Sequence, residues 1–437
     1  AQNTYVPDDK FEQALIDLGY DTTLDDSVLT ANISGVTSLD VYDKQISDLT
    51  GIEAFTALTT LAISNNQLTS INVTSNTALT ILESYANKLT SLDVSNNTAL
   101  TELYVDGAEL ATGLDVSKNT ALTKLYCGGS QLTSLDVSKN TELRYFQCYY
   151  NKITSLDVSK NTALINLDCS ANLLTSLDVS ANTALLNIEG WDNALASLDV
   201  SNNTALIELN VNNNSLTSLD VSKNTALTKL TINENKLTSL DVSKNTGLET
   251  LMCGWNQLTS LDVSKNTALE TLECRDNQLT TLDVTANTAL ISLFFFDNEL
   301  TNLDISKNVA LEILGGDRNK LTSLDVTNNI HITNLNCYGN QLTSLDLSQN
   351  TKLKVLYASE NKLTSLNMRN GVKDALTTFV VHTNPSLTCI EVLDPAWATA
   401  NWTNANNNME MDAGVTFAVI CGGTDLTTWH VATTGSD

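Results

Sequence analysis

The sequence contains few prolines, few histidines and few basic residues. It has 3 Pro, 3 His and 23 Lys plus Arg against 50 Asp plus Glu in 437 residues. With so little proline, no Pro-rich linker divides the chain. The formal net charge of −27 opposes binding to nucleic-acid phosphates and to anionic lipid, since both require clustered Lys and Arg. We therefore expect no nucleic-acid partner, whereas a cationic partner, a neutral glycan or a metal-bridged partner is compatible with the charge.

Long apolar runs are also missing. No stretch approaches the roughly 18 consecutive apolar residues of a membrane span, so we expect no direct membrane insertion. The chain begins at Ala1-Gln2, without Met and without a basic, apolar leader. We expect an extracellular or cell-surface protein whose signal peptide has already been removed, although an arbitrary chain boundary would look the same.

Recognisable catalytic motifs are missing as well. The sequence has no GxSxG, no HExxH and no phosphate-binding glycine loop. Gly128-Gly129 and Gly315-Gly316 are isolated pairs, to which the sequence alone gives no function. None of the three histidines has a neighbour at catalytic or metal-ligand spacing: His331, His382 and His430. We therefore expect no enzyme activity and no cofactor.

What the sequence does contain is an internal repeat. The stretch Leu132–Glu142 reads LTSLDVSKNTE, and near-copies return every 21 residues, separated by looser stretches such as Leu143–Lys152. One extra residue, at Ala111-Thr112-Gly113, interrupts the spacing. A fixed period overrides the two or three domains suggested by the length, because a repeat array is one quasi-linear body. Fifteen periods begin at Leu58, Leu79, Leu100, Leu122, Leu143, Leu164, Leu185, Leu206, Leu227, Leu248, Leu269, Leu290, Leu311, Ile332 and Leu353.

Each period carries the pattern LxxLxVxxN twice. We call the first ten residues the variable half and the next eleven the constant half, and count positions from the first residue of each half. Alternation at positions four to six indicates a strand. Ten residues are too few for a strand, a helix and two turns, so we expect two short strands per coil. The predicted fold is a β-solenoid of about fifteen coils, with two parallel sheets around a thin apolar core.

The repeat resembles bacterial leucine-rich repeat proteins of the 21-residue class, in which both halves carry the leucine consensus. The stretches YVPDDKFEQALIDLGYD and NPSLTCIEV resemble end caps of secreted surface proteins from Gram-negative bacteria. The resemblance implies adhesion or partner recognition. After Cys389 the repeat pattern ends, and we expect a C-terminal cap closed by a disulfide between Cys389 and Cys421, since secreted caps commonly need one. Trp429–Asp437 resembles the opening of a right-handed parallel β-helix domain.

Four regions follow from these signals. Residues 1–35 form an N-terminal helical cap, because Asp8-Asp9 is an acidic helix start and Gly19 is a stop signal. Residues 36–388 form the leucine-rich repeat solenoid. Residues 389–422 form the C-terminal cap, and residues 423–437 are a linker or the start of a further domain.

Asparagine and cysteine recur at inward positions. Asn at position nine of both halves, for example Asn151 and Asn140, can hydrogen-bond the turn backbone and the neighbouring coil, so we assign it a structural role. Cys at position six of the variable half alternates with Ile, Val and Phe, which indicates a small apolar filler. We expect buried free thiols, with stacked disulfides or a metal site as alternatives. The cysteines are Cys127, Cys148, Cys169, Cys253, Cys274 and Cys337.

Aspartate recurs at position five of the constant half, and we call this set the Asp row. Stacked like charges about 5 Å apart should raise some of their pKa values. We interpret the Asp row as a solvated acidic stripe, with binding of a divalent cation such as calcium as the alternative. The row comprises Asp93, Asp115, Asp136, Asp157, Asp178, Asp199, Asp220, Asp241, Asp262, Asp283, Asp304, Asp325 and Asp346.

The outward positions of the variable half differ in character from the constant half. Aromatic and arginine side chains recur there among Asp, Glu, Asn and Gly, which is the composition of recognition surfaces and also suits sugar stacking. Neutral drift is the alternative, but drift would also have scattered the exposed Ser and Asp of the constant half. The predicted ligand-binding residues are Tyr126, Tyr149, Tyr150, Trp191, Trp255, Arg275, Phe294, Phe296, Arg318 and Tyr338.

Three functions remain compatible with the sequence. The first is a non-catalytic extracellular recognition or adhesion module that binds a protein or glycan on a cell surface or in the extracellular matrix. The second is the targeting arm of a larger polysaccharide-active enzyme. The third is a structural spacer without a ligand.

Overall fold

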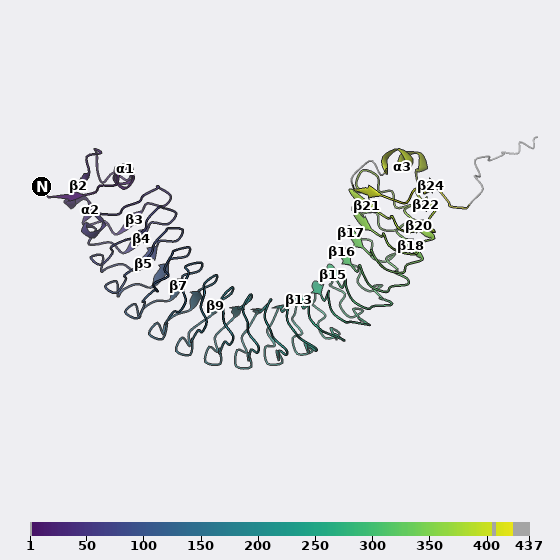
Figure 1. Ribbon diagram of the computed structural model, residues 1–437, viewed down its shortest axis with the longest axis horizontal. Coiled ribbons are helices and arrows are strands. Elements are labelled where there is room, and N and C mark those ends of the chain that lie inside the picture. Colours follow the sequence, from purple (N-terminus) through teal and green to yellow (C-terminus); the bar gives the residue numbers. More distant parts are fainter. Residues whose placement is uncertain (1, 404–407, 423–437) are drawn as a thin grey trace, which may run out of the picture. The chain divides into compact units, whose positions relative to one another are not determined.

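The computed structural model describes residues 2–403 and 408–422. The chain divides into two compact units, Ala1–Leu248 and Glu249–Asp437, and within each unit the strands lie side by side (Figure 1). The repeats form the predicted leucine-rich repeat β-solenoid, with about seventeen turns where about fifteen coils were predicted. Residues 423–437, which include the β-helix-like Trp429–Asp437, lie outside the described residues.

The N-terminal cap contains the predicted helix, α1 (Asp9–Asp17). Asp8 begins it by accepting hydrogen bonds from the backbone N–H groups of Lys10 and Phe11. Phe11 is fully buried, with its ring centre 6.4 Å from that of Phe55, so the helix covers the apolar end of the first repeat. The cap also contains β1 (Asn3–Tyr5), antiparallel to β2 (Ser27–Leu29), and then α2 (Thr30–Ile33). The short 3-10 helix η1 (Ile52–Ala54) follows the cap, in the atypical first turn of the solenoid.

In the first unit the main sheet consists of three-residue parallel strands in register. Its first strand, β3, belongs to the atypical first turn, and each later strand covers positions three to five of a variable half. The middle side chain of each strand is buried, and the outer two face solvent at least in part, except for the buried Thr231 of β12. The strands are β3 (Ser38–Asp40), β4 (Thr60–Ala62), β5 (Ile81–Glu83), β6 (Glu102–Tyr104), β7 (Lys124–Tyr126), β8 (Tyr145–Gln147), β9 (Asn166–Asp168), β10 (Asn187–Glu189), β11 (Glu208–Asn210) and β12 (Lys229–Thr231).

The second unit contains a main sheet of the same kind and a second, four-stranded parallel sheet. The main sheet holds β13 (Thr250–Met252), β14 (Thr271–Glu273), β15 (Ser292–Phe294), β16 (Ile313–Gly315), β17 (Asn334–Asn336), β19 (Val355–Tyr357), β21 (Thr378–Val380) and β23 (Met409–Glu410). The second sheet holds β18 (Ser344–Asp346), β20 (Ser365–Asn367), β22 (Cys389–Glu391) and β24 (Thr416–Ala418). The helix α3 (Pro395–Asn401) lies in the C-terminal cap.

The prediction of two parallel sheets is therefore confirmed only in the C-terminal repeats. From Val41 to Thr343 the described constant halves are turns and extended segments rather than strands. Side chains supply hydrogen bonds that a second sheet would otherwise make. In one repeat, Asp93 Oδ1 accepts the N–H of Ser95, and Asn97 Nδ2 donates to the carbonyl of Val73 at 2.9 Å.

The two Asn rows have the structural role predicted for them. Asn151 Oδ1 accepts the N–H of Leu132 at 2.9 Å, and its Nδ2 donates to the carbonyl of Cys127 in the preceding repeat. Asn140 in the constant half donates to the carbonyls of Val116 and Asn119. These bonds satisfy buried backbone groups at each turn and connect adjacent repeats.

The cysteine predictions are also confirmed. The six cysteines at position six are buried and unpaired. Burial raises the pKa of Cys169, Cys274 and Cys337 to about 12, which keeps these thiols protonated. Cys389 and Cys421 form the predicted disulfide, which joins β22 to the chain after β24.

Candidate functional site

Position eight of the variable half adopts a left-handed backbone throughout the array. The φ angle is 48° at Tyr150 and 47° at both Trp255 and Arg318. A left-handed L-residue costs roughly 1–2 kcal/mol, so Gly, Asn and Asp are the residues expected there. The other positive-φ residues at this position are Asn65, Ala86, Gly107, Gly129, Ala171, Asp192, Asn213, Glu234, Asp276, Asp297, Gly339 and Glu360. Two aromatic rings and an arginine thus occupy positions that favour Gly, Asn or Asp, and Glu234 and Glu360 do so as well.

The predicted residues of the first unit form two aromatic contacts across repeats. Tyr104 and Tyr126 meet edge to face, with ring centres 5.0 Å apart. Tyr150 contacts its neighbour Tyr149 and also reaches Trp191, at 5.9 and 5.5 Å between ring centres. Tyr150 is 59% exposed, so this aromatic group is open to solvent.

The glycine pair Gly128-Gly129, given no function from sequence, makes room for an aromatic ring. A Cβ on Gly128 would lie 2.4 Å from Tyr149 Cζ, so only glycine lets this ring come so close to the backbone. The Tyr149 hydroxyl hydrogen-bonds Asp106, and Asp106 Oδ1 also accepts the N–H of Gly128 at 2.7 Å. A shallow depression of about 420 Å³ lies here, and Tyr85 also lines it.

Acidic side chains that were not among the predicted ligand-binding residues lie beside these rings. Asp168 on β9 and Glu189 on β10 occupy directly paired positions of adjacent strands. Asp168 accepts hydrogen bonds from Ser170, and Glu189 accepts one from Asn210. Burial raises the pKa of both carboxyls, and the charge of Asp168 raises that of Glu189 further. Within the described residues neither forms an ion pair. The sequence did carry a signal for these two residues, because each is an acid at position five of a variable half, next to positions that carry aromatic residues.

In the second unit the predicted residues form a continuous cation–π cluster. The Arg275 guanidinium lies 3.4 Å from the ring centre of Trp255 and 5.0 Å from that of Phe296, and it pairs with Glu273. Arg318 makes two hydrogen bonds to Asp297, at 2.7 and 2.6 Å, and lies 5.9 Å from the ring centre of Tyr338. Such bidentate and stacked contacts hold both arginines in place.

The second glycine pair creates a small apolar hollow in the same unit. Gly315 lies on the outward face of β16, and a Cβ there would lie 2.9 Å from Phe294 Cδ1. Beneath it Gly316 leaves space for the buried ring of Phe295. The hollow measures about 210 Å³ and is lined by Phe294, Phe296, Ile313, Leu314, Gly315, Asp317, Asn334, Leu335, Asn336, Val355 and Tyr357. Both predicted Phe residues therefore face one shared cavity.

The Asp row does not behave as like-charge stacking predicts. In eleven of its members the pKa is lowered rather than raised, because the Ser or Thr two residues on donates both its N–H and its hydroxyl to the carboxylate. The expectation of raised values is wrong for these residues. The carboxylates are exposed, so water screens the repulsion between neighbours.

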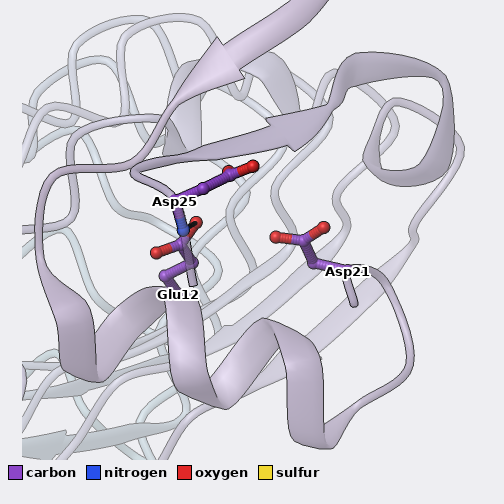
Figure 2. Close-up of side chains that lie close together, drawn as sticks. All are labelled: Glu12, Asp21 and Asp25. Carbon is purple, nitrogen blue, oxygen red and sulfur yellow. Dashed lines mark hydrogen bonds between the residues drawn. The ribbon is translucent and has the colours of Figure 1, made fainter. Parts of the chain in front are cut away.

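One group of three metal-capable side chains lies within the described residues, and it is in the N-terminal cap. Ligand atoms of Glu12, Asp21 and Asp25 lie within 4.8 Å of one another (Figure 2). The Glu12 carboxylate is buried and accepts the backbone N–H groups of Asp25, Asp26 and Ser27 at 2.9–3.1 Å. Glu12 therefore holds the loop of the cap in place. In the same described part, no three Asp-row carboxylates form such a group.

Solved structures share this arrangement of repeats. The functional domain of InlJ from Listeria monocytogenes, described as including a cysteine ladder, is 36% identical; the match covers 84% of this chain and 82% of that one, with a TM-score of 0.77. The internalin InlF from the same species is 25% identical, over 73% and 97% of the two chains, with a TM-score of 0.66. A leucine-rich repeat protein of Leptospira interrogans is 26% identical, over 76% and 92%, with a TM-score of 0.70.

The fold and these matches define a bacterial leucine-rich repeat protein. The chain belongs to the internalin-like family of such proteins. No protein-family model matches the sequence, and no curated protein matches it either. In the described part of the chain, no helix has the length and apolar character needed to cross a membrane.

Proposed function

We propose that this chain is a non-catalytic extracellular recognition module, which binds a protein partner through the outward positions of its variable halves. The observation that carries the proposal is the presence of Tyr150, Trp255 and Arg318 at left-handed backbone positions. These residues strain the fold where Gly or Asn would relieve it. Strain retained at a surface is typical of functional sites.

The packing around these residues supports the same proposal. The aromatic rings are not scattered but contact one another, arginines or glycine backbone. Aromatic and arginine side chains supply most of the binding energy in many protein interfaces. The constant halves, by contrast, present a uniform row of Asp and Ser.

An extracellular or surface location fits the disulfide between Cys389 and Cys421. It also fits the similarity to internalins. Adhesion is the use we propose for a recognition module in that location.

A glycan is the second candidate ligand, because the exposed Tyr150 ring lies next to Trp191 and aromatic rings stack on sugars. The carboxylates beside these rings favour a protein with basic side chains over a neutral sugar. The targeting arm of a polysaccharide-active enzyme would use the same rings.

Binding of the purified chain to arrays of extracellular proteins and of glycans tests the proposal. We expect a protein ligand, and we expect a Trp191→Ala and Trp255→Ala double variant to lose it. A Lys139→Ala and Lys244→Ala double variant, altered on the constant halves, should bind like the parent. Equal binding by both double variants would place the ligand elsewhere and contradict the choice of surface.

A further inference from the structure

In the second unit, side chains of the same chain bind the guanidinium of Arg275. Arg275 occupies position seven of its variable half. Its guanidinium lies against Trp255 and Phe296 and pairs with Glu273 two residues before it. Two aromatic rings and one acid thus form a site for an arginine side chain.

Five periods earlier, the first unit carries the same kinds of side chain at the same repeat positions, except for the arginine. The acid and both rings are present, and a serine stands in the arginine's place. Tyr150 corresponds to Trp255, Asp168 to Glu273, Trp191 to Phe296, and Ser170 to Arg275.

The side chains of the first unit are arranged as expected for such a site without its arginine. Tyr150 and Trp191 come from repeats on either side of Ser170, and their rings meet directly, 5.5 Å apart. Ser170 is buried and donates its hydroxyl to Asp168 at 2.6 Å. No side chain stands between the two rings, which contact each other edge to face above the buried Ser170. An incoming guanidinium would therefore stack on the exposed Tyr150 ring or part the two rings.

The carboxylates of the first unit have only a distant positive neighbour: Lys229 acts on Glu189 but forms its ion pair with Glu208. Asp168 and Glu189 are direct neighbours on adjacent strands, and like charges in that relation destabilise a sheet. Within the described residues, neither one forms an ion pair. A cation supplied from outside would relieve this repulsion, and in the second unit Arg275 supplies the cation beside Glu273.

We propose that Tyr150, Asp168, Glu189 and Trp191 form a binding site for an arginine side chain of a protein partner. The proposal deepens the recognition function and rests on it. A guanidinium suits the site because it is planar, stacks on aromatic rings and donates several N–H groups to carboxylates. Lysine offers a compact charge without the stacking plane, and a neutral sugar leaves the two carboxylates unpaired. The net charge of −27 would speed the approach of a basic partner.

Three peptides of one sequence, carrying arginine, lysine or citrulline at a single central position, test the site against the full chain. Citrulline has nearly the shape of arginine without its charge. Since one charge-assisted contact corresponds to about a tenfold change in affinity, we expect the arginine peptide to bind at least about tenfold more tightly than the citrulline peptide. The lysine peptide should fall between them.

Variants of the chain separate the site from general attraction by negative charge. Ser170→Arg should fill the site from within, as Arg275 does, and abolish the preference for arginine over citrulline. An Asp168→Asn and Glu189→Gln double variant should lose the same preference. An Asp199→Asn and Asp220→Asn double variant makes the same change in net charge on the constant halves and should keep it. Circular dichroism confirms folding, and the double variant decides the outcome if Ser170→Arg does not fold.

Equal affinity for the arginine and citrulline peptides would overturn the proposal. So would an unchanged arginine preference in the Asp168→Asn and Glu189→Gln variant. Loss of the array ligand in the Trp191→Ala and Trp255→Ala variant, with full binding by Ser170→Arg, would reject the arginine site and leave the recognition function standing. A ligand bound only on the glycan array would reject both.

Discussion

The ring of Tyr149 lies on the backbone of Gly128, in the preceding repeat, with no room for even one additional carbon. Gly128→Ala should push the ring away and break the hydrogen bond from Tyr149 to Asp106. We expect a loss of about 1–3 kcal/mol in the free energy of unfolding, measured with urea, because overpacking forces neighbouring groups to move. Gly247→Ala is the matched control: its Cβ would meet nothing closer than 3.8 Å, and we expect little change. Equal stability of the two variants would contradict this account.

The pH dependence of stability should reveal the hydrogen bonds of the Asp row. Hydrogen bonds from the Ser or Thr two residues on lower the pKa of these carboxyls below 3.8. A lowered pKa in the folded state stabilises the fold above the unfolded value, and this contribution is lost as pH falls through the folded value. Tm should therefore fall below about pH 4. Asp136→Asn keeps an acceptor that does not titrate, so its Tm should fall less over the same pH range than that of the parent.

Much of the fold could be predicted from the sequence. The 21-residue period, with Leu at positions one and four and Asn at position nine, sets the coils, the core and the hydrogen-bonded turns. The number of repeats that take part in the second sheet could not be predicted. The LTSLDVSKN pattern looks like a strand, but its Asp and Asn side chains bond to the backbone, and this competes with sheet formation.

The sequence predicts which residues lie on the candidate surface, but it does not predict which of them contact one another. Outward alternation in the variable half identifies Tyr150, Trp191 and Arg275. Their partners depend on side-chain directions between repeats, which spacing alone does not give. The left-handed position eight had a signal, because Gly107, Gly129 and Gly339 share it, but the large residues at the same position concealed it.

Calcium should not stabilise the protein through the Asp row. Each carboxylate of the row is turned toward its own backbone, and no three of them lie together in the described chain. We expect the same Tm in excess calcium and in excess chelator. A rise in calcium that Asp136→Asn and Asp157→Asn remove would contradict this expectation. A rise that Asp21→Asn removes would instead locate the ion in the cap.

Loss of the disulfide should destabilise the C-terminal cap. Cys389 and Cys421 are 32 residues apart, for which loop-closure entropy gives about 3–4 kcal/mol. Reduction, or Cys421→Ala, should lower the free energy of unfolding in urea by this amount.

The six buried thiols should resist iodoacetamide in the folded chain. When the folded protein is first reduced and then alkylated, mass spectrometry should find label only on Cys389 and Cys421. Label on Cys148 under native conditions would contradict the burial assigned to it.

The central claim is that large residues at the left-handed position serve binding at a cost in stability. The most direct measurement is the Tyr150→Gly and Trp255→Gly double variant, assayed for both Tm and binding to the protein found on the array. Glycine relieves the left-handed strain, so we predict a Tm equal to or above that of the parent, with binding reduced by at least about tenfold. A lower Tm with unchanged binding would show that the two side chains serve the fold, and would contradict the account.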